Sequence, residues 1–400
     1  GWHLCCFRVE DMKVFLDHAS TTPLRKVAKE AMMLGLETAA NPSSVHSMGQ
    51  YTRNLLEDAR DSIAKSLDCN RSEVIFNSGG TESDNQAIKG LYWERNKTAD
   101  RKLIISARTE HHAVLDTIEW LEKHEDAEPV WIDVDQFGQI DFNQLREVIG
   151  TRHEEIALIS LMWANNETGV ITDIPGVCAI ANEHSIPVHS DAIAACGHMP
   201  ISFRESGLAA LTVSGHKLGA PIGVAVLIVG RSIKLESLVH GGGQERAMRS
   251  GTMNYPLAMA MAAALEEATE ELDWREAELG NLRDYLESEV ERLIPEVEIT
   301  VKGTNRLPDN SHMIFPGCQG DSLLFLLDIA GVEVSTGSAC QAGVIGPSHV
   351  LLAMGKTEDE ANGCLRITLG YSSTKADVDK FLSAIVEAYS GAKRAGLSAR

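Results

Sequence analysis

The sequence lacks any run of about 18 consecutive apolar residues, the length that a membrane-spanning helix requires. Its first ten residues lack a basic stretch, a long apolar stretch and a small-residue cleavage site, so they do not predict a secretion signal. We treat residues 1–13 as a leader or an appended segment and leave them out of the fold argument. These absences favour a chain that does not enter a membrane.

Positive charge is scarce. Lys and Arg number 36 against 57 Asp and Glu, which gives a formal net charge of −21. A field of that sign repels phosphate backbones and anionic lipid surfaces. Direct binding to nucleic acid or to a membrane surface is therefore not expected.

The cysteines lack the spacing of metal or redox motifs. The sequence has no Cys-x-x-Cys pair and no Cys/His cluster at zinc spacing, so we expect no metal site. Cysteines scattered over a long acidic chain are typical of a reducing compartment, which predicts a cytoplasmic location. The eight are Cys5, Cys6, Cys69, Cys178, Cys196, Cys318, Cys340 and Cys364.

What the chain does have is apolar material for a large core, with 44% hydrophobic residues among 400. Short apolar runs alternate with helix-length stretches, a pattern typical of a parallel sheet covered on both faces. We therefore predict an α/β fold with a mostly parallel seven-stranded sheet. The runs lie at 73–76, 103–106, 130–134, 156–162, 186–189, 211–214 and 224–229.

The pattern changes after Gly251. Residues 255–293 have helical spacing and few helix breakers, which predicts one long helix leaving the first domain. Short strand candidates and a helix beginning near Lys375 follow it. We predict a large domain over 14–255, with 14–22 a segment that could pack on the other domain, and a smaller α+β domain over 256–400. The later strand candidates lie at 297–301, 310–315, 332–335 and 364–369.

Chemistry is expected where the parallel strands end, because such sheets bind ligands beyond the carboxyl ends of their strands. The first strand runs into Asn77-Ser-Gly-Gly-Thr-Glu-Ser-Asp-Asn85 and then a helix. Glycines before a helix start can cradle a phosphate, although a Gly-rich turn capped by Thr81 or Ser78 explains the segment equally well. Nucleotide-binding motifs are absent, so the phosphate would belong to another kind of molecule.

Two further strands end in Asp191 and in Lys217. A lysine amine can form a Schiff base with an aldehyde, and an aspartate can keep a pyridine nitrogen protonated. Taken alone, Lys217 would be a solvated lysine and Asp191 a turn residue. Phosphate cradle, lysine and carboxylate at one sheet edge together predict pyridoxal 5'-phosphate.

Two other segments also follow strands. His111, in Thr109-Glu-His-His-Ala-Val114, could stack on an aromatic cofactor, or it could simply cap a helix. Asn165, in Met162-Trp-Ala-Asn-Asn-Glu-Thr-Gly169, could reach a ring oxygen or a substrate carboxylate, or it could belong to an Asn-rich turn.

Together these segments resemble the cysteine desulfurase family, within the class-V aminotransferase-like group of fold-type I pyridoxal phosphate enzymes. The matching pieces run in the family's order from about residue 14 to 380. Besides the segments already quoted, they are Leu16-Asp-His-Ala-Ser-Thr-Thr-Pro23, Asn41-Pro-Ser-Ser-Val-His46, His189-Ser-Asp191, Ser214-Gly-His-Lys217, Gly241-Gly-Gly-Gln-Glu-Arg246, Arg249-Ser-Gly-Thr252, Thr336-Gly-Ser-Ala-Cys340 and Leu365-Arg366.

The resemblance implies a role for each matched residue. Lys217 would form the Schiff base, Asp191 would pair with the pyridine nitrogen, and His111 would stack on the ring. Asn165 and Arg366 would bind the substrate carboxylate, with Asn165 also near the ring hydroxyl. The phosphate ligands would be Gly80, Thr81, Ser214, His216 and, reaching across from the second subunit of a homodimer, Thr252.

The implied reaction converts L-cysteine to L-alanine and leaves the sulfur as a persulfide on Cys340, the implied nucleophile. His111 could activate this thiol. The stretch 336–346 is rich in small residues, which predicts a mobile loop that resembles the longer version in housekeeping and nitrogen-fixation desulfurases. The sulfur would pass to an acceptor protein, such as an iron–sulfur scaffold or a thiolation enzyme.

One position departs from the family pattern: Ala194 stands where the family usually has a Gln that hydrogen-bonds the cofactor's ring oxygen. Losing one hydrogen bond costs roughly 0.5 to 1.5 kcal/mol, which predicts slower turnover or altered cofactor titration rather than an inactive protein. Three alternatives to a desulfurase remain: a selenocysteine lyase, a pyridoxal phosphate aminotransferase, and a non-catalytic scaffold that binds the cofactor.

Overall fold

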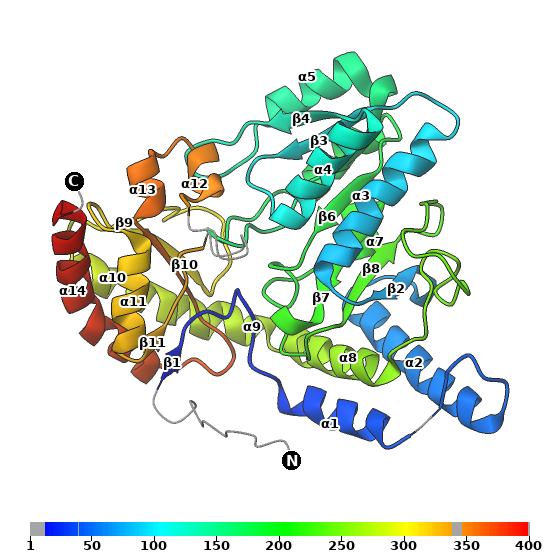
Figure 1. Ribbon diagram of the computed structural model, residues 1–400, viewed down its shortest axis with the longest axis horizontal. Helices are drawn as coiled ribbons and strands as arrows, with labels where there is room; N and C mark the ends of the chain where they lie inside the picture. The colour runs from blue at the N-terminus through cyan, green and yellow to red at the C-terminus, as the bar shows by residue number, and fades with distance from the viewer. Residues whose placement is uncertain (1–12, 39, 338–345, 399–400) are drawn as a thin grey trace.

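The structure is a computed structural model that describes residues 13–38, 40–337 and 346–398. Its largest element is a seven-stranded sheet in the order β2-β8-β7-β6-β5-β3-β4, parallel except for β8, which runs antiparallel to both neighbours. This confirms the predicted fold class (Figure 1). The strands are β2 (Val74–Asn77), β3 (Leu103–Ala107), β4 (Glu128–Ile132), β5 (Ile156–Ser160), β6 (Val188–Asp191), β7 (Ala210–Ser214) and β8 (Ala225–Val229).

Both faces of this sheet are buried because neighbouring residues of each strand point to opposite sides. Ile104 packs with α3 and α4, whereas Ile105 packs with α2, α5, α6 and α8. An apolar residue is therefore needed at nearly every strand position, which is why the strands appear in the sequence as continuous apolar runs. The helices of this part are α1 (Lys26–Leu36), α2 (Ser47–Ser66), α3 (Gly80–Asn96), α4 (His112–Glu125), α5 (Phe142–Arg152), α6 (Ile174–Asn182), α7 (Phe203–Ser206) and α8 (Tyr255–Glu270).

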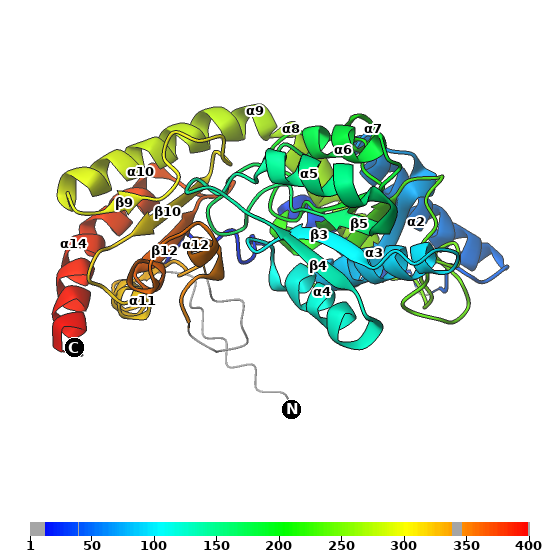
Figure 2. The same cartoon turned by 90° about the horizontal axis from the view of Figure 1, so that it is seen from above.

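A helical arm leads from the large sheet to the rest of the molecule (Figure 2). The single helix predicted over 255–293 is helical almost throughout but is interrupted. After α8 come the short α9 (Leu272–Trp274), a π-helical turn at Arg275–Leu279, and α10 (Gly280–Leu293). The buried Arg275 at this turn lies 2.5 Å from Asp309, and His198 of the large part lies 2.6 Å from the same carboxylate.

The second part contains an antiparallel sheet in the order β12-β10-β9. The start of the described chain also lies here, since β1 (Val14–Phe15) pairs in parallel with β11 (Val332–Glu333). A separate apolar core fills this part, and the division at residue 255 remains a prediction. Its other elements are β9 (Glu298–Ile299), β10 (Asn310–Ile314), α11 (Gly320–Ile329), α12 (His349–Ala353), α13 (Glu358–Asn362), β12 (Cys364–Thr368) and α14 (Lys375–Ser398).

No helix within the described ranges is long and apolar enough to cross a membrane. The same residues contain no group of His, Cys, Asp and Glu side chains placed to hold a metal ion.

Candidate active site

A cavity of about 300 Å³ lies where the large sheet's strands end, and residues of the second part close its other side. It collects side chains from distant points of the sequence. Thr252 is exposed and does not line the cavity, and Cys340 lies outside the described residues. The predicted site residues that do line it are Gly80, Thr81, His111, Asn165, Asp191, Ser214, His216, Lys217 and Arg366, together with Ala194.

The Gly-rich turn forms one end of the cavity. α3 begins at Gly80, and a Cβ atom at this position would displace the terminal methyl group of Ile193. The N-terminus of this 17-residue helix therefore faces the cavity without a side chain in the way, which suits a phosphate. Burial and the charge of Lys217 lower the pKa of His216 to about 4, so this ring is neutral at pH 7.

Lys217 lies in a short helical turn directly after β7. Its Nζ atom donates hydrogen bonds to the backbone oxygens of Ala19 and Ser20, at 2.5 and 2.6 Å. The positive charge of Lys217 acts on the groups around it: it adds to burial in lowering the pKa of His111, and it opposes the burial that raises the pKa of Asp191. The amine is thus held in the cavity among groups whose protonation it influences.

Asp191 ends β6 and is buried, with its Oδ1 accepting a hydrogen bond from the Ile193 amide at 2.8 Å. Asp84, one helical turn after Gly80, is fully buried nearby and has its Oδ1 3.6 Å from His189 Nε2. Burial raises the pKa values of both carboxyl groups, and the charge of Asp191 raises that of Asp84 further. Burial lowers the pKa of His189 to about 3, so the ring supplies no positive charge to these carboxylates.

His111 caps the N-terminus of α4, as one of its sequence interpretations predicts, and also lines the cavity. Its Nδ1 accepts a hydrogen bond from the Ala113 amide at 3.0 Å. Burial, followed by the charge of Lys217, lowers its pKa to about 4. The ring is therefore neutral and carries its proton on Nε2. Nε2 is a hydrogen-bond donor, and Nδ1 is already engaged by the Ala113 amide.

Asn165 opens a tight turn, 165–169, after β5. Its Oδ1 accepts hydrogen bonds from the backbone amides of Glu167 and Thr168, both at 2.9 Å. Its Nδ2 donates a hydrogen bond to the backbone oxygen of Thr109 at 2.9 Å. Nδ2 also lies 3.4 Å from the Met162 sulfur, a weak acceptor. A ligand could replace the Met162 sulfur as the acceptor of this second N–H.

Arg366, on β12, supplies the positive charge opposite the large sheet. Its side chain is 4% exposed. Nη1 donates a hydrogen bond to the backbone oxygen of Asn166 at 2.9 Å, and Nη2 donates one to Asp17 Oδ1 at 2.8 Å. Within the described part of the chain, its Nε has no hydrogen-bond partner. A planar guanidinium with an unused donor suits a carboxylate ligand.

Sequence reasoning gave no role to Asp17 or Asp84, although both lie in the quoted segments. For Asp84 a signal existed: it lies four residues after Gly80, so helical geometry places both on one face of α3. For Asp17 there was none, because its contact with Arg366 spans 349 positions.

These residues fit pyridoxal phosphate. The helix terminus at Gly80 leaves room for a phosphate, and Lys217 presents an amine. The neighbouring His189 is neutral, so it does not offset the charge of the buried carboxyl groups of Asp191 and Asp84. A cationic ring nitrogen would supply the missing positive charge.

Comparison with known proteins agrees with this geometry. Residues 14–381 match the family described as aminotransferase class-V. An "IscS-like cysteine desulfurase" from Mycobacterium tuberculosis is 46% identical over 390 residues, which cover 96% of this chain and 98% of that protein. A "Cysteine desulfurase IscS" from Dictyoglomus turgidum is 42% identical, covering 93% of each chain.

A solved structure, a "NIFS-LIKE PROTEIN", superposes with a TM-score of 0.88 at 33% identity and covers 95% of this chain and 100% of that one. A second, "SspA in complex with cysteine", has a TM-score of 0.76 at 31% identity and covers 89% and 98%. The chain therefore belongs to the class-V aminotransferase family and, within it, to the pyridoxal phosphate-dependent cysteine desulfurases.

Proposed function

We propose that this chain takes L-cysteine into the cavity, releases L-alanine and keeps the sulfur as a persulfide on Cys340. The C–S bond of cysteine breaks, an S–S bond to the Cys340 sulfur forms, and the Cys340 thiol proton balances the hydrogen gained at the alanine methyl group. The observation that carries the proposal is the gathering of Lys217, Asp191, His111 and Arg366 around one cavity that Gly337, three residues before Cys340, also lines.

The chain's own residues divide the work. Pyridoxal phosphate, when bound, supplies the electron sink for breaking bonds at the substrate's Cα and Cβ atoms. Arg366 binds the substrate carboxylate through a guanidinium held in place by Asn166 and Asp17. Lys217 Nζ takes up and returns the proton at Cα. His111 is neutral, with its Nδ1 engaged by the Ala113 amide, so we assign its Nε2–H a hydrogen bond to a bound group and not removal of the Cys340 proton.

The assignment of the thiol rests partly on the other cysteines. All five in the described ranges are buried and free, and burial raises the pKa of each thiol. A buried, protonated thiol is a poor nucleophile. The five are Cys69 and Cys178, each with a pKa of about 12, Cys196 at about 12, Cys318 at about 11, and Cys364.

We propose a homodimer in which Thr252 of each subunit completes the phosphate site of the other. Two observations support it: Thr252 is exposed and outside its own cavity, and α1 exposes Met33, Leu34 and Leu36. Exposed apolar side chains on one helix are typical of a covered surface. Size-exclusion chromatography with light scattering tests the dimer, and a monomer that binds the cofactor fully would contradict it.

We further propose that the enzyme works in the reducing cytoplasm and passes its sulfur to an acceptor protein. Free, buried cysteines support the compartment. The net charge of −21 favours a basic acceptor surface, on an iron–sulfur scaffold or a thiolation enzyme.

Product analysis tests the activity. The holoenzyme is mixed with L-cysteine, and alanine, sulfide, keto acid and protein-bound persulfide are measured. We expect alanine with persulfide from the wild type, neither from Cys340→Ser, and both from the control Cys178→Ala. A keto acid product would indicate an aminotransferase, and selenocysteine turnover that survives Cys340→Ser without cysteine turnover would indicate a selenocysteine lyase.

A further inference from the structure

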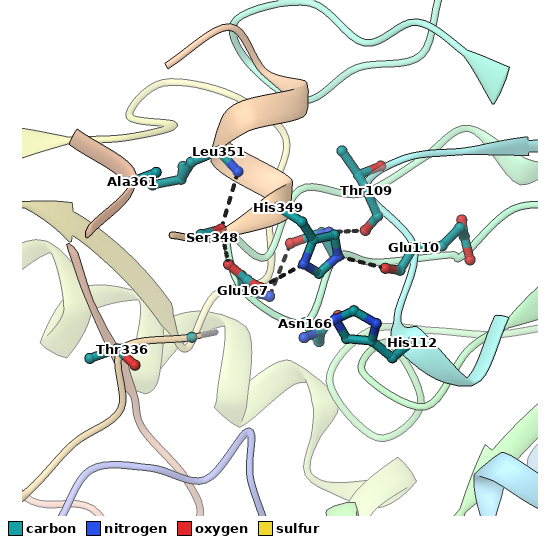
Figure 3. Close-up of polar contacts among 12 residues, drawn as sticks. Thr109, Glu110, His112, Asn166, Glu167, Thr336, Ser348, His349, Leu351 and Ala361 are labelled. Carbon is teal, nitrogen blue, oxygen red and sulfur yellow. Dashed lines mark hydrogen bonds and ion pairs between the residues drawn. The ribbon is translucent and has the colours of Figure 1, made fainter. Parts of the chain in front are cut away.

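The turn 165–169 carries a buried carboxylate that the mechanism above does not use. Glu167 is 1% exposed, and burying a carboxylate costs free energy unless polar partners surround it. Its Oε2 accepts a hydrogen bond from the Ser348 hydroxyl at 2.5 Å, and His349 Nδ1 lies 4.0 Å from its Oε1 (Figure 3). Both partners come from the start of α12 in the second part of the molecule.

His349 is also held from its other side. Its Nε2 lies 2.9 Å from the backbone oxygen of Glu110, which can only accept, so Nε2 carries a proton. The remaining ring nitrogen faces the Glu167 carboxylate, and the His112 ring lies 4.8 Å away between centroids (Figure 3). The Glu110 oxygen therefore holds this imidazole through a hydrogen bond, and the Glu167 carboxylate lies near it without that hold, at 4.0 Å.

Glu167 also lies against the chain on the other side of the stretch 338–345. Gly337 has a φ of +79°, and a Cβ atom there would lie 3.2 Å from Glu167 Oε2. The chain can pass this carboxylate so closely only because residue 337 is glycine. Gly337, before the stretch that contains Cys340, and Ser348, after it, thus lie at one carboxylate.

The same turn also positions Arg366, the residue proposed to bind the substrate carboxylate. The backbone oxygen of Asn166 accepts a hydrogen bond from Arg366 Nη1 at 2.9 Å. Two neighbouring residues of one turn therefore bind Arg366 and Ser348 through hydrogen bonds, and one of them lies against Gly337. We propose that Glu167 is a positioning residue for sulfur transfer: it fixes Ser348 through a hydrogen bond and lies against Gly337, so that the stretch between them presents the Cys340 thiol to the substrate bound at Arg366. The proposal rests on the proposed role of Cys340.

A role for Glu167 in stabilising α12 alone would have different consequences from a positioning role. Ser348 caps α12 by accepting from the Leu351 amide at 3.1 Å, and this bond does not involve Glu167. Removing the carboxylate would leave the cap in place. A structural role would change unfolding, whereas a positioning role changes sulfur transfer while leaving cysteine binding intact.

The test compares Glu167→Ala, Glu167→Gln and, as a matched control, Glu183→Ala at an exposed position outside the cavity. Each holoenzyme is mixed rapidly with L-cysteine. The change in cofactor absorbance reports capture of cysteine, and quenched samples analysed by mass spectrometry report persulfide on Cys340. We expect Glu167→Ala to capture cysteine within about twofold of wild type and to form persulfide roughly tenfold more slowly or worse, since small misplacements cost large factors in rate.

Glu167→Gln keeps an oxygen that accepts from Ser348, so it should recover most of the persulfide rate, and Glu183→Ala should match wild type. Unchanged persulfide formation in Glu167→Ala, or an equal fall in capture and transfer, overturns the proposal. If Glu167→Ala does not fold, Glu167→Asp, whose shorter side chain withdraws the carboxylate from Ser348 and leaves the α12 cap intact, must show the same split between capture and transfer, and its absence overturns the proposal too. A wild type that forms no persulfide on Cys340 instead refutes the proposed function.

Discussion

The two sides of the cavity differ in the charges that they keep. On the large-sheet side, burial lowers the pKa values of His111 and His189 and raises that of Asp191, so each group shifts toward its neutral form. On the other side, burial also lowers the pKa of His18, to about 4, but two ion pairs keep their charges: Arg366 with Asp17, and Arg275 with Asp309. The first side is completed by a cofactor that brings its own charge, whereas the second is ready for an anionic substrate group. Cofactor chemistry and substrate recognition should therefore be separable by mutation.

The largest effect is expected from the cofactor side. Lys217→Ala removes the amine that we propose to move the Cα proton, and losing a general base costs roughly 10²- to 10⁴-fold in rate. Alanine formation should fall by at least about 10²-fold while cysteine still binds, because Arg366 is untouched. The exposed Lys234→Ala is the control and should behave as wild type. Near-normal alanine formation by Lys217→Ala would contradict its assignment.

The substrate side should show a smaller loss of a different kind. Arg366→Lys keeps a positive charge but cannot contact Asn166, Asp17 and a carboxylate at once. A charged hydrogen bond is worth about 1.5 to 3 kcal/mol, so kcat/KM for cysteine should fall roughly 10- to 100-fold, mainly through KM. Steady-state kinetics on holoenzyme with an unchanged cofactor spectrum checks this. A fall in kcat alone would place Arg366 elsewhere in the reaction.

Acid should destabilise both parts, through one buried histidine in each sheet. Burial lowers the pKa values of His189 on β6 and His312 on β10 to about 3. Between pH 6.5 and about 3, the unfolded chain binds protons that the folded chain does not, so stability falls as pH falls. His312→Gln should reduce the loss between pH 7.5 and 5.5 by about 1.4 kcal/mol.

Urea unfolding followed by circular dichroism at the two pH values measures this difference, with the exposed His240→Gln as control. An equal pH dependence in wild type and His312→Gln would show that His312 does not remain neutral in the folded protein.

The smallest effect is expected at Ala194, which lines the cavity on the cofactor side. Ala194→Gln adds one hydrogen-bonding group, worth roughly 0.5 to 1.5 kcal/mol, or about two- to tenfold. We expect faster turnover or a shifted pH for the change in cofactor absorbance, with KM for cysteine unchanged. No change in either rate or spectrum would contradict the idea that this position matters.

Local patterns in the sequence predicted much of this arrangement. Runs such as the one ending at Ser214 are apolar because both faces of the sheet are covered, so strands and the polar residues after them could be recognised directly. The π-helical turn at Arg275 could not, because the residues around it have ordinary helical spacing. It lies where a buried guanidinium reaches Asp309, a contact between residues 34 positions apart.

The site was predicted in the same uneven way. Lys217 and Asp191 could be found because each follows a strand, and parallel strand ends share an edge. The roles of Asp17 and Glu167 could not be found, since each depends on a partner that only tertiary packing brings near. Glu167 in particular lies within a quoted segment, yet nothing local distinguishes a buried anchor from a turn residue.

The most direct measurement of the central claim is a single turnover of the holoenzyme with one equivalent of L-cysteine and no reductant. The account predicts one alanine per active site and one added sulfur, 32 Da, on the peptide that contains Cys340. Alanine formed with no sulfur on that peptide, or with the sulfur on a different cysteine, would contradict it.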